Sequence, residues 1–232
     1  PEHVGDQAAR QTLRRLGARR VPTCRVPVIY EAPVASSLLG HFISAISGGA
    51  LYRKASFLLD HLDKKIFPEF VRIHEQPLIM GGMGSAAFDG EGVATSARDI
   101  VSDGILRGYV LGSYSARRLE LQTTGNAGGV HNLTIDTGDQ NLEQMISGID
   151  EGFLVTELIG FGINNVTGDY SRGAAGLWIE NGEIAYPVEE VTVAGNLKDI
   201  FQNIAAIGND VDPRRSTRCG SILVEGLTIA GD

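Results

Sequence analysis

An Asn-Gly pair at residues 181 and 182 constrains the fold of this chain more than any other feature of its sequence. The pair separates two short runs rich in apolar residues, 177–180 and 184–186, and a glycine-rich segment leads into the first run. Asn-Gly favours positive φ at both central turn positions, which matches the twist of two strands joined by a two-residue turn. The sequence therefore predicts a β-hairpin across residues 177–186.

A second turn signal, Asp103-Gly104, lies between the apolar runs 99–101 and 105–110 and predicts another hairpin. Two more apolar runs, 28–30 and 221–229, are typical of strands that are buried in a sheet. Strands joined by tight turns pair with their neighbours in antiparallel fashion. We therefore expect most of the sheet to be antiparallel.

Helical spacing of apolar residues predicts helices that interrupt the strands without alternating regularly with them. This pattern favours an α+β fold, a mainly antiparallel β-sheet built from hairpins with a few inserted helices. We expect one domain over residues 1–232, helix-rich in 1–66 and mainly β in 67–232. The expected helices cover residues 5–16, 36–47, 55–62, 141–149 and 196–205.

The charge of the chain is unevenly distributed. Its formal net charge is −8, yet residues 1–25 hold six arginines against two acidic residues, so the remainder is strongly acidic. An acidic body argues against binding to duplex DNA, because that affinity depends largely on neutralised phosphates. No apolar run approaches the roughly 20 residues of a membrane helix, and two cysteines make a poor disulfide framework. We expect a cytoplasmic protein without a membrane or nucleic-acid partner.

The histidines do not form a recognisable metal motif. A zinc peptidase helix carries two histidines about one turn apart and a glutamate that activates water. None of the five histidines has another within a helical turn, and His74-Glu75 is followed by Pro77, which would break a helix. The sequence therefore predicts no metal site from spacing alone.

Two other segments could carry chemistry. Residues 169–173 resemble a nucleophile elbow around Ser171 but lack its leading glycine, so Tyr170, Ser171 and Arg172 could instead bind a peptide backbone. Cys219 directly precedes an expected strand and could be a buried apolar side chain or a metal ligand. Both readings stay open at this point.

Nine sequence blocks follow one another in a characteristic order. One of them reads Gly-Gly-Ala-Leu-Tyr-Arg-Lys-Ala-Ser at residues 48–56. The blocks lie at 48–60, 88–93, 103–106, 113–117, 125–132, 168–173, 194–197, 208–210 and 219–221. Their order resembles the C-terminal domain of the TldD/PmbA family, also called modulators of DNA gyrase, and most closely its PmbA (TldE) branch. The resemblance implies the fold of that domain and predicts that the family's N-terminal α/β domain is absent from this sequence.

In the TldD branch, a His-Glu-x-x-x-His helix and a late cysteine bind zinc, and the glutamate acts as general base. Alignment on Arg53-Lys54 places the two histidine ligands at Gly40 and Ala45, and the base at His41. The late cysteine corresponds to Cys219. The resemblance thus implies a degenerate site with no catalytic and no metal-binding residue in this chain.

The family membership implies a non-catalytic subunit of a cytoplasmic TldD–TldE zinc metallopeptidase complex. Such a subunit would shape the proteolytic chamber and bind unfolded peptides, with zinc in the TldD-like partner. Candidate peptide-binding residues are Tyr170, Ser171, Arg172 and His131. In isolation we expect a homodimer.

Two alternative functions remain at this stage. One is a stand-alone hydrolase whose site lies near Cys219, His41 or Ser171. The other is a binding protein associated with gyrase or nucleic acid, against which the acidic body weighs.

Overall fold

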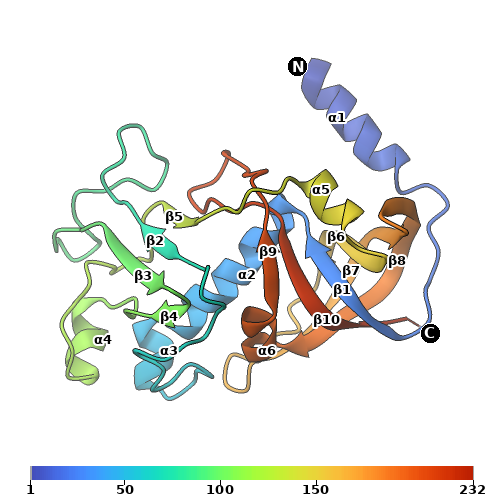
Figure 1. The fold of residues 1–232 in the computed structure, drawn as a ribbon. Coiled ribbons are helices and arrows are strands. Elements are labelled where there is room, and N and C mark those ends of the chain that lie inside the picture. The colour runs from blue at the N-terminus through green and yellow to red at the C-terminus, as the bar shows by residue number, and fades with distance from the viewer. Residues whose placement is uncertain (1, 232) are drawn as a thin grey trace.

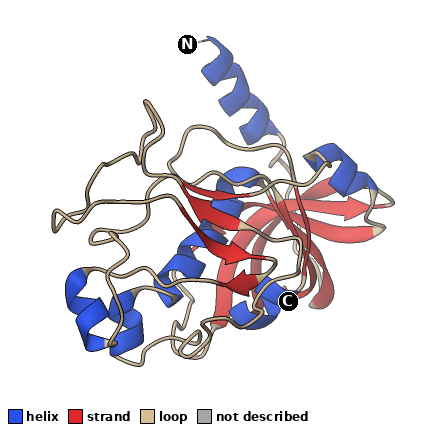
Figure 2. Ribbon diagram, turned by 60° about the vertical axis from the view of Figure 1, so that its left-hand side comes forward, coloured by secondary structure: helices blue, strands red, loops and turns tan. Residues whose placement is uncertain are grey.

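The computed structural model describes residues 2–231 and is dominated by one large sheet (Figures 1 and 2). This sheet has six strands in the order β1-β6-β7-β8-β10-β9. A smaller sheet has the order β4-β3-β2-β5. The strands of the large sheet are β1 (Cys24–Tyr30), β6 (Glu151–Ile159), β7 (Asp169–Glu180), β8 (Glu183–Asn196), β9 (Ile204–Ile207) and β10 (Ile222–Ala230).

The large sheet closes on itself through β10. One edge of β10 pairs with β1, and its other edge pairs with β9 and then with β8. Only β1 and β6 run parallel; the remaining pairs of the sheet are antiparallel. Figure 1 shows β1 and β10 side by side, although they come from opposite ends of the chain. The expected mainly antiparallel α+β fold is confirmed.

The predicted hairpin at Asn181-Gly182 joins β7 and β8. Asn181 and Gly182 have φ values of 52° and 78°, as a turn with two left-handed residues requires. Glu180 and Glu183 pair directly across the turn. The two strands extend well beyond the predicted runs, because β7 and β8 remain paired along nearly their whole length.

The second predicted hairpin, at Asp103-Gly104, joins β3 to β4, but β4 ends at Leu106 and not at residue 110. Val110 leaves the strand because its backbone N–H and C=O bond to Ile46 and Gly48 instead. The small sheet consists of β2 (Ile73–Glu75), β3 (Arg98–Ser102), β4 (Ile105–Leu106) and β5 (Leu133–Ile135).

Four of the five expected helices are present with shifted ends. The helix expected at 36–47 begins earlier, because Pro33 suits the first turn of a helix and extends it toward β1. Within residues 2–231, no helix is both long and apolar enough to cross a membrane. The helices are α1 (Glu2–Leu13), α2 (Ala32–Ala45), α3 (Gly48–Tyr52), α4 (Ser113–Arg118), α5 (Leu142–Ser147) and α6 (Leu197–Gln202).

The prediction of a helix at 55–62 is wrong, since this segment forms turns. Lys54 and Asp60 have φ values of 55° and 58°, which a right-handed helix does not accommodate. The hydroxyl of Ser56 donates to the carbonyl of Ala45 and accepts from the N–H of Leu58. Bonds of this kind replace the helical ones. The short helices α3 and α4 were not predicted by the apolar spacing.

Helix α2 connects the two sheets through its buried face. Leu38, Phe42 and Ala45 are buried on this face, and the Phe42 ring contacts Phe67 at 5.2 Å and Phe201 at 6.0 Å between centroids. Figure 1 shows α2 crossing the region between the sheets. The position of α2 therefore determines which other segments of the chain lie beside its first turns.

The hairpin turn provides a first test of this architecture. Gly182 and Gly160 both have φ +78°, but an added Cβ would lie 3.0 Å from the Ser147 carbonyl oxygen at Gly182 and in open space at Gly160. Gly160→Ala should cost about 1 kcal/mol of backbone strain. Gly182→Ala should cost on the order of 1 kcal/mol more, because the turn must also move away from Ser147. Urea unfolding measures both losses, and equal losses would contradict the close approach.

Candidate functional site

A cleft of about 770 Å³ opens beside the first turns of α2. Residues 33–37 of α2 form one wall, and residues 156–158 of β6 with Arg172 of β7 form another. The loop before β10 closes it with residues 214–217, and Met83 reaches in from the loop between β2 and β3. Five segments of the chain therefore meet at one site.

Guanidinium groups dominate the charge of this cleft. Arg214 is held by Asp212 through a two-pronged contact at 2.8 and 3.0 Å, which lowers the pKa of that carboxyl. Arg215 donates only to the neutral hydroxyl of Ser36, at 3.3 Å. Glu157, on the opposite wall, is paired with an arginine outside the cleft, at 2.7 Å. The positive charge of the cleft is thus only partly compensated.

The side chain of Arg172 has neither an ion pair nor a hydrogen bond with any group that the structure describes. Its side chain is half-buried, and its Nε atom is shielded from solvent without a partner. Burial and the charge of Arg172 together lower the pKa of His41 on α2. Arg172 therefore links the cleft to a buried polar cluster beneath it.

That cluster contains Tyr170, which was predicted to bind substrate. Tyr170 is 1% exposed, and its ring meets the imidazole of His41 edge-on at 6.1 Å. Burial raises the pKa of Tyr170 and that of the neighbouring Tyr30. Tyr170 supports the floor of the site, while Arg172 alone of the predicted residues lines the cleft.

Ser171 lies on the opposite face of β7 from Tyr170 and Arg172, because side chains alternate along a strand. It is exposed, and its backbone N–H donates to the carbonyl of Gly162 at 2.7 Å. The structure therefore separates Ser171 from the imidazole that a serine nucleophile would need.

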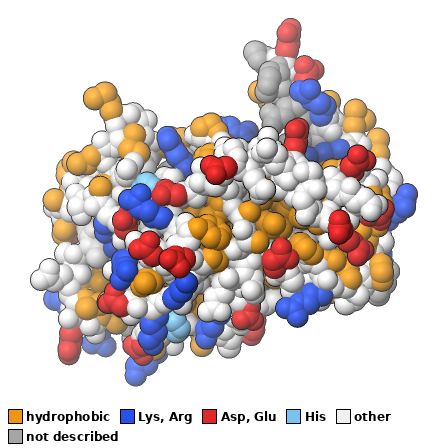
Figure 3. Space-filling model, in the orientation of Figure 1, with side chains coloured by type: hydrophobic (Ala, Val, Ile, Leu, Met, Phe, Trp, Pro, Cys, Tyr) orange, Lys and Arg blue, Asp and Glu red, His pale blue; other side chains and the backbone are white. Residues whose placement is uncertain are grey.

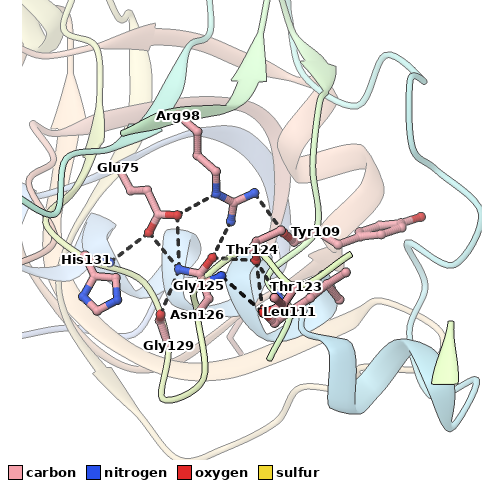
Figure 4. A network of polar contacts seen from close by, with 10 residues as sticks. All are labelled: Glu75, Arg98, Tyr109, Leu111, Thr123, Thr124, Gly125, Asn126, Gly129 and His131. Carbon is pink, nitrogen blue, oxygen red and sulfur yellow. Dashed lines mark hydrogen bonds and ion pairs between the residues drawn. The ribbon is translucent and has the colours of Figure 1, made fainter. Parts of the chain in front are cut away.

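His131 belongs to a polar network beside the small sheet (Figure 4). The buried carboxylate of Glu75 accepts from Arg98 at 2.7 Å, from the Asn126 amide and from the His131 backbone N–H. Arg98 also donates to the Tyr109 carbonyl and the Asn126 side chain. Because every charge in this network has partners, its arrangement indicates a structural role.

The positions that the resemblance assigns to zinc ligands do not carry a suitable donor set. Gly40 and Ala45 have no side-chain donor, and Gly40 is exposed while Ala45 is buried. Burial, with a further contribution from Asp210, raises the pKa of the Cys219 thiol to about 12, so it is protonated at neutral pH. Its S–H donates to the carbonyl of Gly220 at 3.0 Å. Catalytic zinc takes three protein ligands, and these residues do not fit it.

Among the side chains that the structure describes in residues 2–231, which leave out those of residues 3 and 7, no three of His, Cys, Asp or Glu gather closely enough to hold a metal ion. His41 has a buried ring nitrogen without a partner, but Arg172 beside it would repel a cation. The arrangement of His41 and Arg172 suits an anion better than a metal.

The class of the protein is shown by its match to a known family of domains. The PmbA/TldA metallopeptidase C-terminal domain matches residues 23–231, and the chain belongs to this family. It is 52% identical over 231 residues to Metalloprotease PmbA of Escherichia coli O157:H7, covering 100% of the chain and 51% of that relative. Identity to a Metalloprotease TldD homolog of Buchnera aphidicola is 23% over 251 residues. The resemblance to the PmbA branch is thus confirmed.

Solved structures agree with this assignment. A Bacteroides thetaiotaomicron protein described as a candidate modulator of DNA gyrase superposes with a TM-score of 0.94 at 36% identity, covering 98% of this chain and 52% of that one. TldE from Thermococcus kodakarensis gives a TM-score of 0.87 at 25% identity, covering 99% and 55%. The chain thus spans about half the length of the relatives it matches.

Arg214 and Arg215 were not among the predicted site residues, although the fold brings them into the same cleft as Arg172. A signal was present, because two adjacent arginines follow Pro213 in an otherwise acidic chain. Their distance from residue 172 in the sequence concealed the grouping.

The network around Glu75 generates a stability prediction. Arg98→Ala leaves the buried Glu75 carboxylate without its cation and should cost roughly 3–5 kcal/mol of unfolding free energy. Arg72→Ala removes a half-exposed partner of Asp99 on the same sheet and should cost less than about 1 kcal/mol. Denaturant unfolding of both variants checks the difference, and similar small losses would show that Glu75 does not depend on Arg98.

The lowered pKa of His41 generates a pH prediction. A histidine with a lowered pKa in the folded state binds its proton more readily when unfolded. Its contribution to stability is complete above its ordinary pKa of 6.5 and is lost as the pH falls below it. Between pH 7.5 and 5.5, His41→Gln should therefore lose less unfolding free energy than the parent chain. Parallel unfolding curves at both pH values test this, and an unchanged difference would contradict it.

Proposed function

We propose that this chain is the C-terminal domain of a PmbA/TldE-like subunit in a cytoplasmic zinc metallopeptidase complex. In this complex a TldD-like partner carries the zinc and cuts peptides. The observation that carries the proposal is the donor set on α2, where Gly40 and Ala45 stand at the positions expected to bind the metal. The protonated, buried Cys219 supports the same view.

The contribution of this chain is then to shape the chamber and hold unfolded peptides. The cleft beside α2 supports this role, because it combines guanidinium donors with apolar wall residues such as Val34 and Leu158. A peptide offers carbonyl and carboxylate acceptors along an apolar chain, which this lining matches. Arg172 is its leading peptide-binding residue.

The same surface that meets a TldD-like partner can pair with a second copy when the partner is missing. We therefore propose a homodimer for the isolated chain. Exposed apolar side chains on the loop between β2 and β3, including Leu78 and Met80, are consistent with such a surface (Figure 3).

A stand-alone hydrolase receives less support from the same geometry. A cysteine nucleophile acts as a thiolate, whereas the raised pKa of Cys219 keeps it protonated. A serine nucleophile needs an adjacent base, whereas Ser171 and His41 lie on different faces of β7. These observations favour a chain whose chemistry depends on a partner.

Metal content and activity test the proposal together. We expect near one zinc per TldD-like subunit and none retained by this chain, as measured by elemental mass spectrometry. Unfolded peptides should be cleaved only when the TldD-like subunit is present, and this chain should increase the rate. Cys219→Ser should leave zinc content and cleavage unchanged, because the thiol is buried and protonated.

Two results would contradict the proposal. One zinc per copy of this chain, lost in Cys219→Ser, would contradict the proposal and indicate a metal site in this subunit. Cleavage by this chain alone, abolished by Ser171→Ala, would favour the hydrolase.

A further inference from the structure

We propose that the cleft beside α2 binds the carboxylate of a peptide, with Arg172 as the main ligand and Arg215 and Ser37 as secondary ones. This inference rests on the proposed function only for the choice of a peptide as the source of the carboxylate. The inference names the chemical group of the ligand and the side chains that bind it. The shape of the cleft alone would not identify either.

The first argument is the state of Arg172. A guanidinium has five N–H donors in a fixed plane and no acceptor, so it is normally satisfied by carboxylates, carbonyls or water. None of these donors has a protein partner within residues 2–231, and the Nε atom is shielded from solvent. Buried polar groups almost always have a partner. Because Arg172 lines the cleft, its remaining donors can meet an acceptor there that the chain itself does not supply.

The second argument is the rest of the lining. The hydroxyl of Ser37 is also buried without a partner, and it lines the same cleft as Arg172. Arg215 donates a hydrogen bond to the neutral Ser36 and also helps to lower the pKa of Asp212, whose hydrogen bonds go to Arg214. Arg172 of β7 and Arg215 of the loop before β10 therefore share one cleft with the hydroxyl of Ser37 on α2.

The third argument is the position of the acidic groups nearby. Glu157 pairs with Arg15 at 2.7 Å, and Asp212 pairs with Arg214 at 2.8 Å. Both carboxylates are thus held by other arginines, and neither neutralises Arg172. In a chain of net charge −8, such an uncompensated cationic cleft favours an incoming anion.

The size and lining of the cleft select the kind of anion. A volume of about 770 Å³ is far larger than one carboxylate and lies in the range of ligand pockets. Pro33, Val34 and Leu158 give it apolar wall area beside the arginines. An arginine binds a carboxylate through two parallel hydrogen bonds, while the apolar walls suit the adjoining peptide residues. A nucleic acid would instead require a broad basic surface, which the acidic body does not offer.

Calorimetric titration of this chain with three N-acetylated hexapeptides of Gly, Ser and Ala tests the proposal. One peptide ends in a free acid, one in an amide, and one in an amide with an internal Glu. We expect the free acid or the Glu peptide to bind at least about tenfold more tightly than the plain amide, which identifies the source of the carboxylate. Added salt should reduce this preference.

The variants make the test specific. Arg172→Gln should abolish the preference, and Arg215→Gln should reduce it. Arg118→Gln, at an exposed arginine of α4 outside the cleft, should leave it unchanged. Thermal unfolding shows whether each variant is folded. If Arg172→Gln does not fold, Arg215→Gln still tests whether the cleft binds the carboxylate.

Equal affinity for all three peptides would overturn the proposal, as would a preference that survives in both Arg172→Gln and Arg215→Gln. Displacement by inorganic phosphate with equal binding of acid and amide would also overturn it, because the site would then take a free anion. The titration uses this chain alone, so it stands or fails independently of complex formation. Loss of peptidase stimulation with intact carboxylate binding would refute the proposed function only.

Discussion

The pairing of β1 with β10 determines how the rest of the molecule is arranged. It joins the first strand of the chain to the last along six pairs of residues and closes the large sheet. Helix α2 follows β1 directly, and the N–H of Ala32 in its first turn donates to the Ser221 hydroxyl just before β10. Ser221 in turn donates to Asp210 at 2.6 Å. The position of α2, and with it one wall of the cleft, thus depends on contacts between distant parts of the chain.

Two arginines on neighbouring layers illustrate the difference between a structural and a binding charge. Arg98 donates to Glu75, to Asn126 and to the Tyr109 carbonyl, so its charge holds the loop before β5 in place. Arg172 has no such partner and faces a cleft. Burying a charge without a partner is costly, and a site that binds an anion is one setting in which that cost is offset.

Local turn chemistry accounts for the predictions that were confirmed. Asn181-Gly182 and Asp103-Gly104 form turns with positive φ at both residues, because these residue types tolerate that conformation. The segment 55–62 failed for a tertiary reason, since Ser56 and Phe57 bond to distant backbone groups at Ala45 and Asn165. Apolar spacing cannot anticipate such bonds. Short helices such as α4 likewise carry too few residues to show a period.

The sequence by itself determined the hairpins, the α+β class and the family, because turn residues and ordered sequence blocks act locally or by resemblance. It also identified Arg172, although for its place beside Ser171 rather than for its lack of a partner. Only the tertiary structure decided that Arg172 meets Arg215 and Ser37 in one cleft, and that Ser171 and His131 lie elsewhere. The reason is physical: closure of the sheet sets which groups from distant segments share a surface, and this cannot be read from spacing along the chain. Alternation along β7 then places Ser171 on the face opposite Arg172.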